Sequence, residues 1–332
     1  MNLVPKDLAI FFDEASHKYT DAKNREYIST TTIIGKFVEE QDWKAIAQAC
    51  ANIGARPIPP GHRNYNKYIR YRGKTVKQIL AEWKIETDKA CAKGTEKHNF
   101  LETCIKKSNN YFLDNEGYIN GRIYTIDDII RTHNYGRLTL DYFDKTGIRD
   151  RYPTIYEFIK DMVKLGFEIY AEIGVYNEDY LISGLVDVLL VRKDEFFILD
   201  WKTNKAPIRF EAGYWGKKAD GTIDLDNYIL TDKTMMYPIN HLADSTGIHY
   251  SLQLSMYAYL IEHWGFKYVG TMLAHIRTIE NSLIPDNMPH EEVITFVPIK
   301  YLKAEVKAIC DWRKAQLEKE KKSNINLFNY ND

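Results

Sequence analysis

The chain has 332 residues, 45% of them hydrophobic and 27% charged, which excludes a disordered, collagen-like or low-complexity protein and allows one large or two ordinary domains. It has no run of about 18 uncharged apolar residues and no apolar stretch behind a basic start, so we expect no membrane span, no signal peptide and a cytoplasmic location. The net charge of −1 hides an uneven distribution, because residues 56–107 hold 13 Lys or Arg and 5 Asp or Glu.

The N-terminal part predicts a hairpin followed by helices. Apolar runs broken at residues 21–24 favour strands, and a Ser/Thr cluster precedes a helix expected over about 33–50. Helical spacing then covers residues 75–106, with a turn and a second helix start expected at Gly94 and Thr95.

The central part predicts an antiparallel meander. Three apolar, β-rich runs, at residues 167–176, 181–191 and 196–202, are separated by short polar turns of hairpin length. The pattern indicates an α/β fold whose mixed sheet combines this meander with a strand after a crossover helix, flanked by helices. The other elements are expected at 154–166 (helix), 250–264 (helix), 268–275 (strand), 293–297 (strand) and from about 300 (helix).

We expect one compact unit with three parts. Residues 1–107 form a hairpin and helical region that contributes His98 and a basic segment, and residues 108–152 form a variable insertion. Residues 153–332 form the core, in which residues 206–247 are expected to be a long surface loop because they show little periodicity.

Two acids and a lysine lie at the ends of the central strand patterns. Asp187 and Asp200 each end an otherwise apolar strand pattern, where an unpaired charge would cost several kcal/mol to bury. Adjacent antiparallel strands can bring both acids to one sheet edge, and Lys202 shares a strand face with Asp200. Carboxylates in this arrangement suit Mg²⁺ or Mn²⁺, and the lysine can orient or deprotonate an attacking water.

The Asp-x-Lys tripeptide is weak by itself, because acid-x-Lys recurs elsewhere as an ordinary solvated charge pair. Only the triplet at 200–202 follows an apolar strand that is itself preceded by a strand with an acid. A strand-end ion pair is the alternative interpretation of this triplet. The other occurrences are at 21–23, 42–44, 82–84, 305–307 and 320–322.

Four separated segments, taken together and in order, are a more specific signal than any one of them. KGTEKHNFLE contains His98, SGLVDVLL contains Asp187, ILDWKTNK contains Asp200 and Lys202, and YSLQLSMYAYLIE follows them. In this order they resemble the PD-(D/E)XK nuclease superfamily, in its RecB-like branch. The resemblance implies a restriction-endonuclease-like core, and hydrolysis of phosphodiester bonds with Mg²⁺ or Mn²⁺.

The same resemblance assigns roles to individual residues. It implies that His98, the backbone carbonyl of Trp201 and Glu172 join Asp187 and Asp200 as metal ligands. An ordinary surface or core role is the alternative for His98, and the Glu172 assignment rests on its strand position alone. The resemblance further implies that Gln253 and Tyr257, one turn apart on one helix face, brace the catalytic Lys202, and that Gln253 contacts DNA.

Cysteine usage favours a reducing compartment without an iron–sulphur cluster. The four cysteines are too few and too scattered for a disulfide framework, and no C-x-x-C pair occurs. Cys310 is the only late cysteine, whereas the iron–sulphur subset of the branch has three. The N-terminal segment HKYTDAKNREYISTTTIIGKF, with Trp83, resembles bacteriophage exonucleases similar to the mitochondrial genome maintenance exonuclease.

Residues 62–77 have the composition of a single-strand binding surface. Their Lys and Arg would contact phosphates and their Tyr would stack on bases, although a solvated basic loop is the alternative. The candidate residues are Arg63, Tyr65, Lys67, Tyr68, Arg70, Tyr71, Arg72, Lys74 and Lys77.

Three functions remain open from the sequence. The first is a metal-dependent DNA exonuclease that prefers single strands or free ends, in phage or bacterial replication, recombination or repair, with proteins of those processes as further partners. The others are a structure-specific endonuclease and a non-catalytic DNA-binding module of the same fold.

Overall fold

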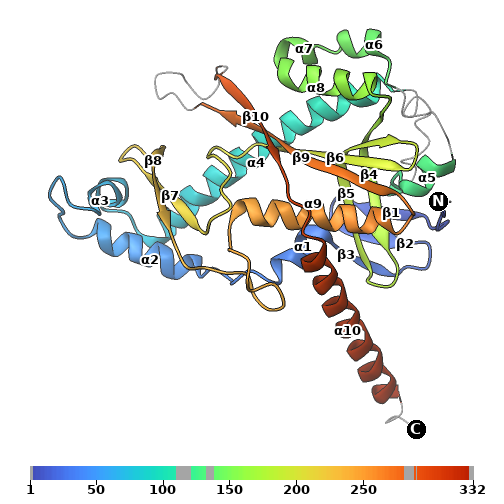
Figure 1. Ribbon diagram of the computed structural model, residues 1–332. Helices are drawn as coiled ribbons and strands as arrows, with labels where there is room; N and C mark the ends of the chain where they lie inside the picture. Colours follow the sequence, from blue (N-terminus) through green and yellow to red (C-terminus); the bar gives the residue numbers. More distant parts are fainter. Residues whose placement is uncertain (1–2, 110–120, 132–137, 280–287, 289, 329–332) are drawn as a thin grey trace.

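The computed structural model describes residues 3–109, 121–131, 138–279, 288 and 290–328. It shows a mixed α/β protein with helices on both faces of a mixed sheet (Figure 1). The strands are β1 (Ile10–Asp13), β2 (Lys18–Asp21), β3 (Glu26–Ser29), β4 (Glu168–Asn177), β5 (Ile182–Arg192), β6 (Glu195–Lys202), β7 (Gly213–Lys217), β8 (Ile223–Leu230), β9 (Lys267–Thr278) and β10 (Glu292–Pro298). The helices are α1 (Thr30–Gly35), α2 (Trp43–Gly54), α3 (Tyr65–Tyr71), α4 (Val76–Lys107), α5 (Ile126–Arg131), α6 (Leu140–Asp144), α7 (Ile148–Arg151), α8 (Pro153–Lys164), α9 (Thr246–Glu262) and α10 (Lys303–Phe328).

In the described part of the chain, eight strands form the main sheet, in the order β1-β2-β3-β5-β6-β9-β10, with β4 also paired to β5. The β4–β5–β6 meander is antiparallel, and β9 pairs parallel to β6 after the crossover through α9. The predicted meander, crossover helix and two late strands are therefore confirmed. On one edge β5 pairs with β3 at its start and with β6 at its end, so residues 184–187 face a gap between those two ladders.

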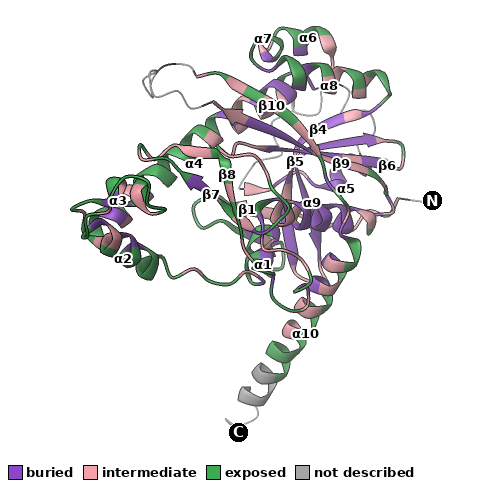
Figure 2. Ribbon diagram, turned by 60° about the vertical axis from the view of Figure 1, so that its left-hand side comes forward, coloured by how far each residue is buried: buried purple, intermediate pink, exposed green. Residues whose placement is uncertain are grey.

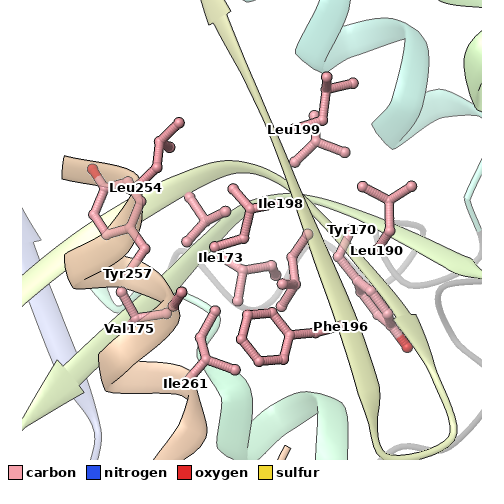
Figure 3. Close-up of a cluster of buried hydrophobic side chains, with 14 of the residues drawn as sticks. Tyr170, Ile173, Val175, Leu190, Phe196, Ile198, Leu199, Leu254, Tyr257 and Ile261 are labelled. Carbon is pink, nitrogen blue, oxygen red and sulfur yellow. The ribbon is translucent and has the colours of Figure 1, made fainter. Parts of the chain in front are cut away.

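The main core lies between the sheet and its covering helices. Figure 3 shows side chains of α9, among them Ile261, gathered with Ile173 and Val175 of β4. On the opposite face, Phe158 of α8 contacts aromatic residues of β6 and β10. Burial of this apolar surface, at about 25 cal/mol per Å², is the main driving force for the α/β layers.

A second, smaller buried cluster stands apart from this core. Ala47, Cys50, Tyr71 and Ile79 join α2 and α3 to the first half of α4. The β7–β8 hairpin docks on the same helices, since the Asn66 side chain donates a hydrogen bond to the Lys217 carbonyl at 3.4 Å. We call α2, α3, the first half of α4 and this hairpin the small lobe. Figure 1 shows it to one side of the sheet, and Figure 2 shows mostly exposed ribbon over α2 and α3.

Three sequence predictions need correction. The helix expected over 33–50 is two helices, because Ser29 caps α1 and Asp42 caps α2 with hydrogen bonds to the Thr32 and Ala45 amides. No turn forms at residues 94–95, where α4 is continuous. The expected loop at 206–247 contains the β7–β8 hairpin. The variable insertion expected at 108–152 contains α5, α6 and α7, and its residues 110–120 and 132–137 lie outside the described residues.

The charged C-terminal end also forms a helix, which projects away from the sheet in Figure 1. Its first turns bury Val306, Ile309 and Cys310. None of the helices within the described ranges combines the length and the apolarity that crossing a membrane requires.

Candidate active site

The end of β6 carries a buried acid and a lysine. Asp200 and Lys202 alternate onto the same face of the strand as Ile198, which Figure 3 shows beside α9. Asp200 is fully buried, and Lys202 Nζ lies 2.5 Å from its Oδ2. Apart from this ion pair, neither Asp200 oxygen accepts a well-aligned hydrogen bond from a described residue. Asp200 therefore retains acceptor capacity in a buried position, which is costly unless a cation uses it.

Asp187 lies beside Asp200 where β5 and β6 diverge. Val188 and Leu199 form the last pair of the β5–β6 ladder, so the two acids are the next residues beyond it. Asp187 Oδ2 accepts a hydrogen bond from the Trp201 backbone N–H at 2.9 Å. The strand ends thus bring both acids and Lys202 together at the gap in the β5 edge.

Helix α4 brings His98 to the same place. His98 Nδ1 lies 3.7 Å from Asp187 Oδ2. Burial and the nearby Lys202 charge lower the pKa of His98 below its usual value. The neutral imidazole that this favours is the form that binds metal ions.

Two contacts fix α4 next to this histidine. A Cβ added to Gly94 would lie 2.9 Å from Thr203 Oγ1, so glycine lets the helix approach the end of β6 closely. The buried Lys97 donates a hydrogen bond to Thr278 Oγ1 at 2.8 Å and pairs with Glu292. The glycine that the sequence presents as a helix break is therefore a packing contact inside a helix.

Glu172 of β4 lies opposite Asp187, across β5 from that gap. Pairing between β4 and β5 is interrupted only at Glu172 and Asp187, and the register is the same on both sides. Glu172 has a φ of +54°, a left-handed conformation that strains a residue with a side chain and that clusters at functional sites. Burial, then the charges of Asp187 and Glu102, raise the pKa of Glu172 to about 9.

The central residues shift one another's protonation. Burial, then the Asp187 charge, raise the pKa of Asp200 to about 7, and burial also raises the pKa of Asp187. Burial opposes the charged form of Lys202, but Asp200 and Asp187 outweigh it, so the pKa of Lys202 lies above its usual value. The positive charge of Lys202 therefore does not fully offset the cost of burying several carboxylates next to one another.

We call His98, Glu172, Asp187, Asp200 and Lys202 the charged cluster. The described residues contain no closed cage of three or more His, Cys, Asp or Glu side chains around one point. The donor types nevertheless fit a hard divalent cation, because Asp200 has unused acceptor capacity, Asp187 is adjacent and His98 favours its neutral form. The Trp201 backbone N–H donates its hydrogen bond to Asp187 in this arrangement.

Gln253 and Tyr257 of α9 lie next to the charged cluster. Among the described residues, neither forms a hydrogen bond with Lys202. Gln253 Nε2 donates to Tyr257 Oη at 3.0 Å, and burial and the Asp200 charge raise the pKa of Tyr257. A Cβ added to Gly184 would lie 2.6 Å from Tyr257 Cε1, so this glycine makes room for the tyrosine ring. Among the described residues the hydrogen bond of Gln253 ends at Tyr257, so the bracing of Lys202 by this pair stays a prediction.

The basic segment lies in the small lobe and is only partly available to a ligand. Tyr68 and Tyr71 are 8% and 7% exposed, because α3 packs them inward, so they cannot stack on bases as expected from the sequence. Arg70 pairs with Glu86 and Lys74 with Glu82, each at 2.8 Å. Tyr65 is half-buried, and the exposed cations of this segment are Arg63, Lys67, Arg72 and Lys77.

Two residues near the cluster were not among the predicted site residues. Glu102 lies one turn after His98 on α4 and raises the pKa of Asp187 and Glu172, so helical spacing from His98 was the available signal. Tyr250 contacts Lys202 and lies three residues before Gln253 on the same side of α9.

Comparisons with known proteins found no matching family model, no matching curated protein and no matching solved structure.

Proposed function

We propose that this chain is a metal-dependent deoxyribonuclease with a restriction-endonuclease-like core of the PD-(D/E)XK type. The observation that carries the proposal is the convergence of His98, Asp187, Asp200 and Lys202 from α4, β5 and β6, with unused acceptor capacity on Asp200. A simple strand-end ion pair would need neither the second acid nor the histidine.

The residues divide into metal-holding and water-orienting groups. Asp187, Asp200 and His98, with Glu172 and the Trp201 carbonyl as further ligands, would hold Mg²⁺ or Mn²⁺. When bound, the cation would offset the negative charge that develops on the phosphate and lower the pKa of a bound water. The Lys202 ammonium, 2.5 Å from Asp200, is in position to hold the attacking water or a phosphate oxygen by hydrogen bonding.

We further propose that the substrate is DNA with a single-stranded part or a free end, and that the enzyme is an exonuclease in phage or bacterial replication, recombination or repair. The exposed cations of residues 62–77 supply sequence-independent phosphate contacts. The half-buried Tyr65 adds one aromatic face.

The test compares matched linear and circular single-stranded DNA in buffer with Mg²⁺, with EDTA as the control. Degradation of linear DNA alone supports the exonuclease. Cleavage of circles would replace it with an endonuclease. Binding without cleavage, in Mg²⁺ and in Mn²⁺, would contradict the proposed nuclease activity and favour a non-catalytic DNA-binding module.

A further inference from the structure

The Lys202 ammonium lies over the ring of Tyr250, an aromatic residue that is not among the predicted site residues. Lys202 Nζ is 4.9 Å from the centroid of the Tyr250 ring, in the first turns of α9. The ring face attracts a cation, more strongly where water is excluded. Because Asp200 Oδ2 lies 2.5 Å from the same nitrogen, the ammonium is held between a carboxylate and a ring.

The Tyr250 ring is itself fixed by two further residues. Its hydroxyl donates a hydrogen bond to Asn204 Oδ1 at 2.7 Å. The backbone carbonyl of Asn204 accepts a hydrogen bond from His275 Nε2 at 2.9 Å. His275 is 4% exposed and is the direct partner of Lys202 in the β6–β9 ladder.

These contacts form a closed loop around the lysine. From Lys202 the loop passes across the ladder to His275, through Asn204 to Tyr250, and back to the ammonium. A lysine side chain has large rotamer freedom, so an ammonium that must orient a water gains from being held. By contrast, the described hydrogen bond of Gln253 goes to Tyr257.

We infer that Tyr250 is a positioning residue for Lys202, with Asn204 and His275 holding its ring in place. The catalytic consequence rests on the proposed nuclease function, whereas the contact between ring and ammonium does not. The ring is the essential part, and the hydroxyl only fixes its orientation.

The activity test separates these two parts on linear single-stranded DNA in Mg²⁺. Tyr250→Leu removes ring and hydroxyl, and we expect kcat to fall about tenfold, with KM unchanged within about twofold. Tyr250→Phe keeps the ring and should retain at least about a third of the wild-type kcat. Equal losses in the two variants, or a loss seen only in KM, would overturn the inference.

The control is a second tyrosine with a lysine near its ring. Tyr142 is 61% exposed on α6, and Lys145 Nζ lies 5.5 Å from its ring centroid. Tyr142→Leu removes a similar contact in an exposed position and should leave kcat unchanged.

A double-mutant cycle tests the contact without any nuclease activity. Unfolding midpoints are measured for wild type, Tyr250→Leu, Lys202→Met and the double variant, all in EDTA. We expect a smaller loss from Tyr250→Leu when Lys202 is already Met, because the two side chains interact directly. Additive shifts would overturn the inference. Coupled shifts in a protein that cuts no DNA would refute the proposed function and leave the contact in place.

Discussion

The charged cluster and the small lobe use ionisable groups in opposite ways. At the end of β6, carboxylates are buried in the main core, where Asp200 and Glu172 have raised pKa values. In the small lobe, four cations of one segment are exposed around a core of a few side chains. The comparison teaches that a large core can hold groups that repel one another, whereas a small core presents its charges to solvent. Chemistry is therefore expected at the first region and substrate holding at the second.

The largest expected effect comes from one substitution in the charged cluster that should abolish cleavage while leaving DNA binding in the small lobe intact. Asp200→Asn removes a charge that a cation needs, so we expect DNA cleavage to fall by at least about 10³-fold. DNA affinity should stay within about threefold, because the exposed cations are intact. Cleavage of labelled linear single strands and fluorescence anisotropy measure the two quantities. Asp194→Asn, at the other end of the β5–β6 hairpin, is the control, and full activity of Asp200→Asn would refute the assignment.

Core substitutions compare the stability of the two regions. Ile198→Ala in the main core should lower the free energy of unfolding of the whole chain by about 2–5 kcal/mol. Ile79→Ala in the small lobe should instead open α2 and α3 locally, because their cluster is small and separate. Hydrogen exchange of α2 and α3, set against the sheet, distinguishes these effects. Equal loss of protection everywhere in Ile79→Ala would show that the two cores unfold together.

Divalent metal should stabilise only the first region. Saturating Mn²⁺ should raise the unfolding midpoint of the wild type by about 5 °C, because binding to the folded state alone is favourable and relieves carboxylate repulsion. EDTA should reverse the shift. The double variant Asp187→Asn, Asp200→Asn should show no shift, and an equal shift there would move the metal site elsewhere.

Charge removal in the small lobe should change binding and not chemistry. The triple variant Arg63→Gln, Lys67→Gln, Lys77→Gln should lower the slope of log affinity against log salt by about 2, since three phosphate contacts are lost on a single strand. The matched control is Arg70→Gln with Lys74→Gln, whose cations are already paired. An equal change in both variants would place the binding surface outside these exposed residues.

The last prediction concerns Lys6, which belongs to neither region. Burial, opposed by Asp127, Glu178 and Asp179, lowers the pKa of Lys6 to about 8, while its Nζ lies 3.7 Å from the Trp264 ring centroid. Between about pH 8 and 10.5 the unfolded chain binds the extra proton, so this group makes the protein more stable as pH rises through that window. Thermal melts of wild type and Lys6→Met should differ in slope there, and parallel slopes would contradict the shift.

The sequence predicted the central fold because its signals are local. The runs that became β4, β5 and β6 carry their own turns, and the acid at each strand end made the cluster visible. The prediction failed where a contact between residues distant in the sequence determines the local structure or the burial of a side chain. Gly94 breaks a helix by local rules, but here it fits α4 against Thr203. Tyr68 and Tyr71 look available in a basic segment, but both are buried, Tyr71 in the cluster that joins α2 and α4.

The β7–β8 hairpin and Tyr250 were missed for the same reason. β7 contains two glycines and β8 contains two Asp and one Asn, residue types that are depleted in strands, and the two strands pair only with each other within the described residues. Tyr250 shares a helix face with the predicted Gln253, but its partner Lys202 is on another element. Spacing within one helix cannot identify such a partner.

The middle of α4 is exposed on all sides over residues 84–93, between its packing in the small lobe and its packing beside the sheet. At about 1.5 Å per residue, the stretch from Ile79 to His98 measures about 28 Å. Under the proposed function, a strand that contacts the exposed cations of the small lobe and is cut at the charged cluster would span about this length, or about eight stacked nucleotides. We therefore expect oligonucleotides shorter than this span to reach only one of the two regions at a time.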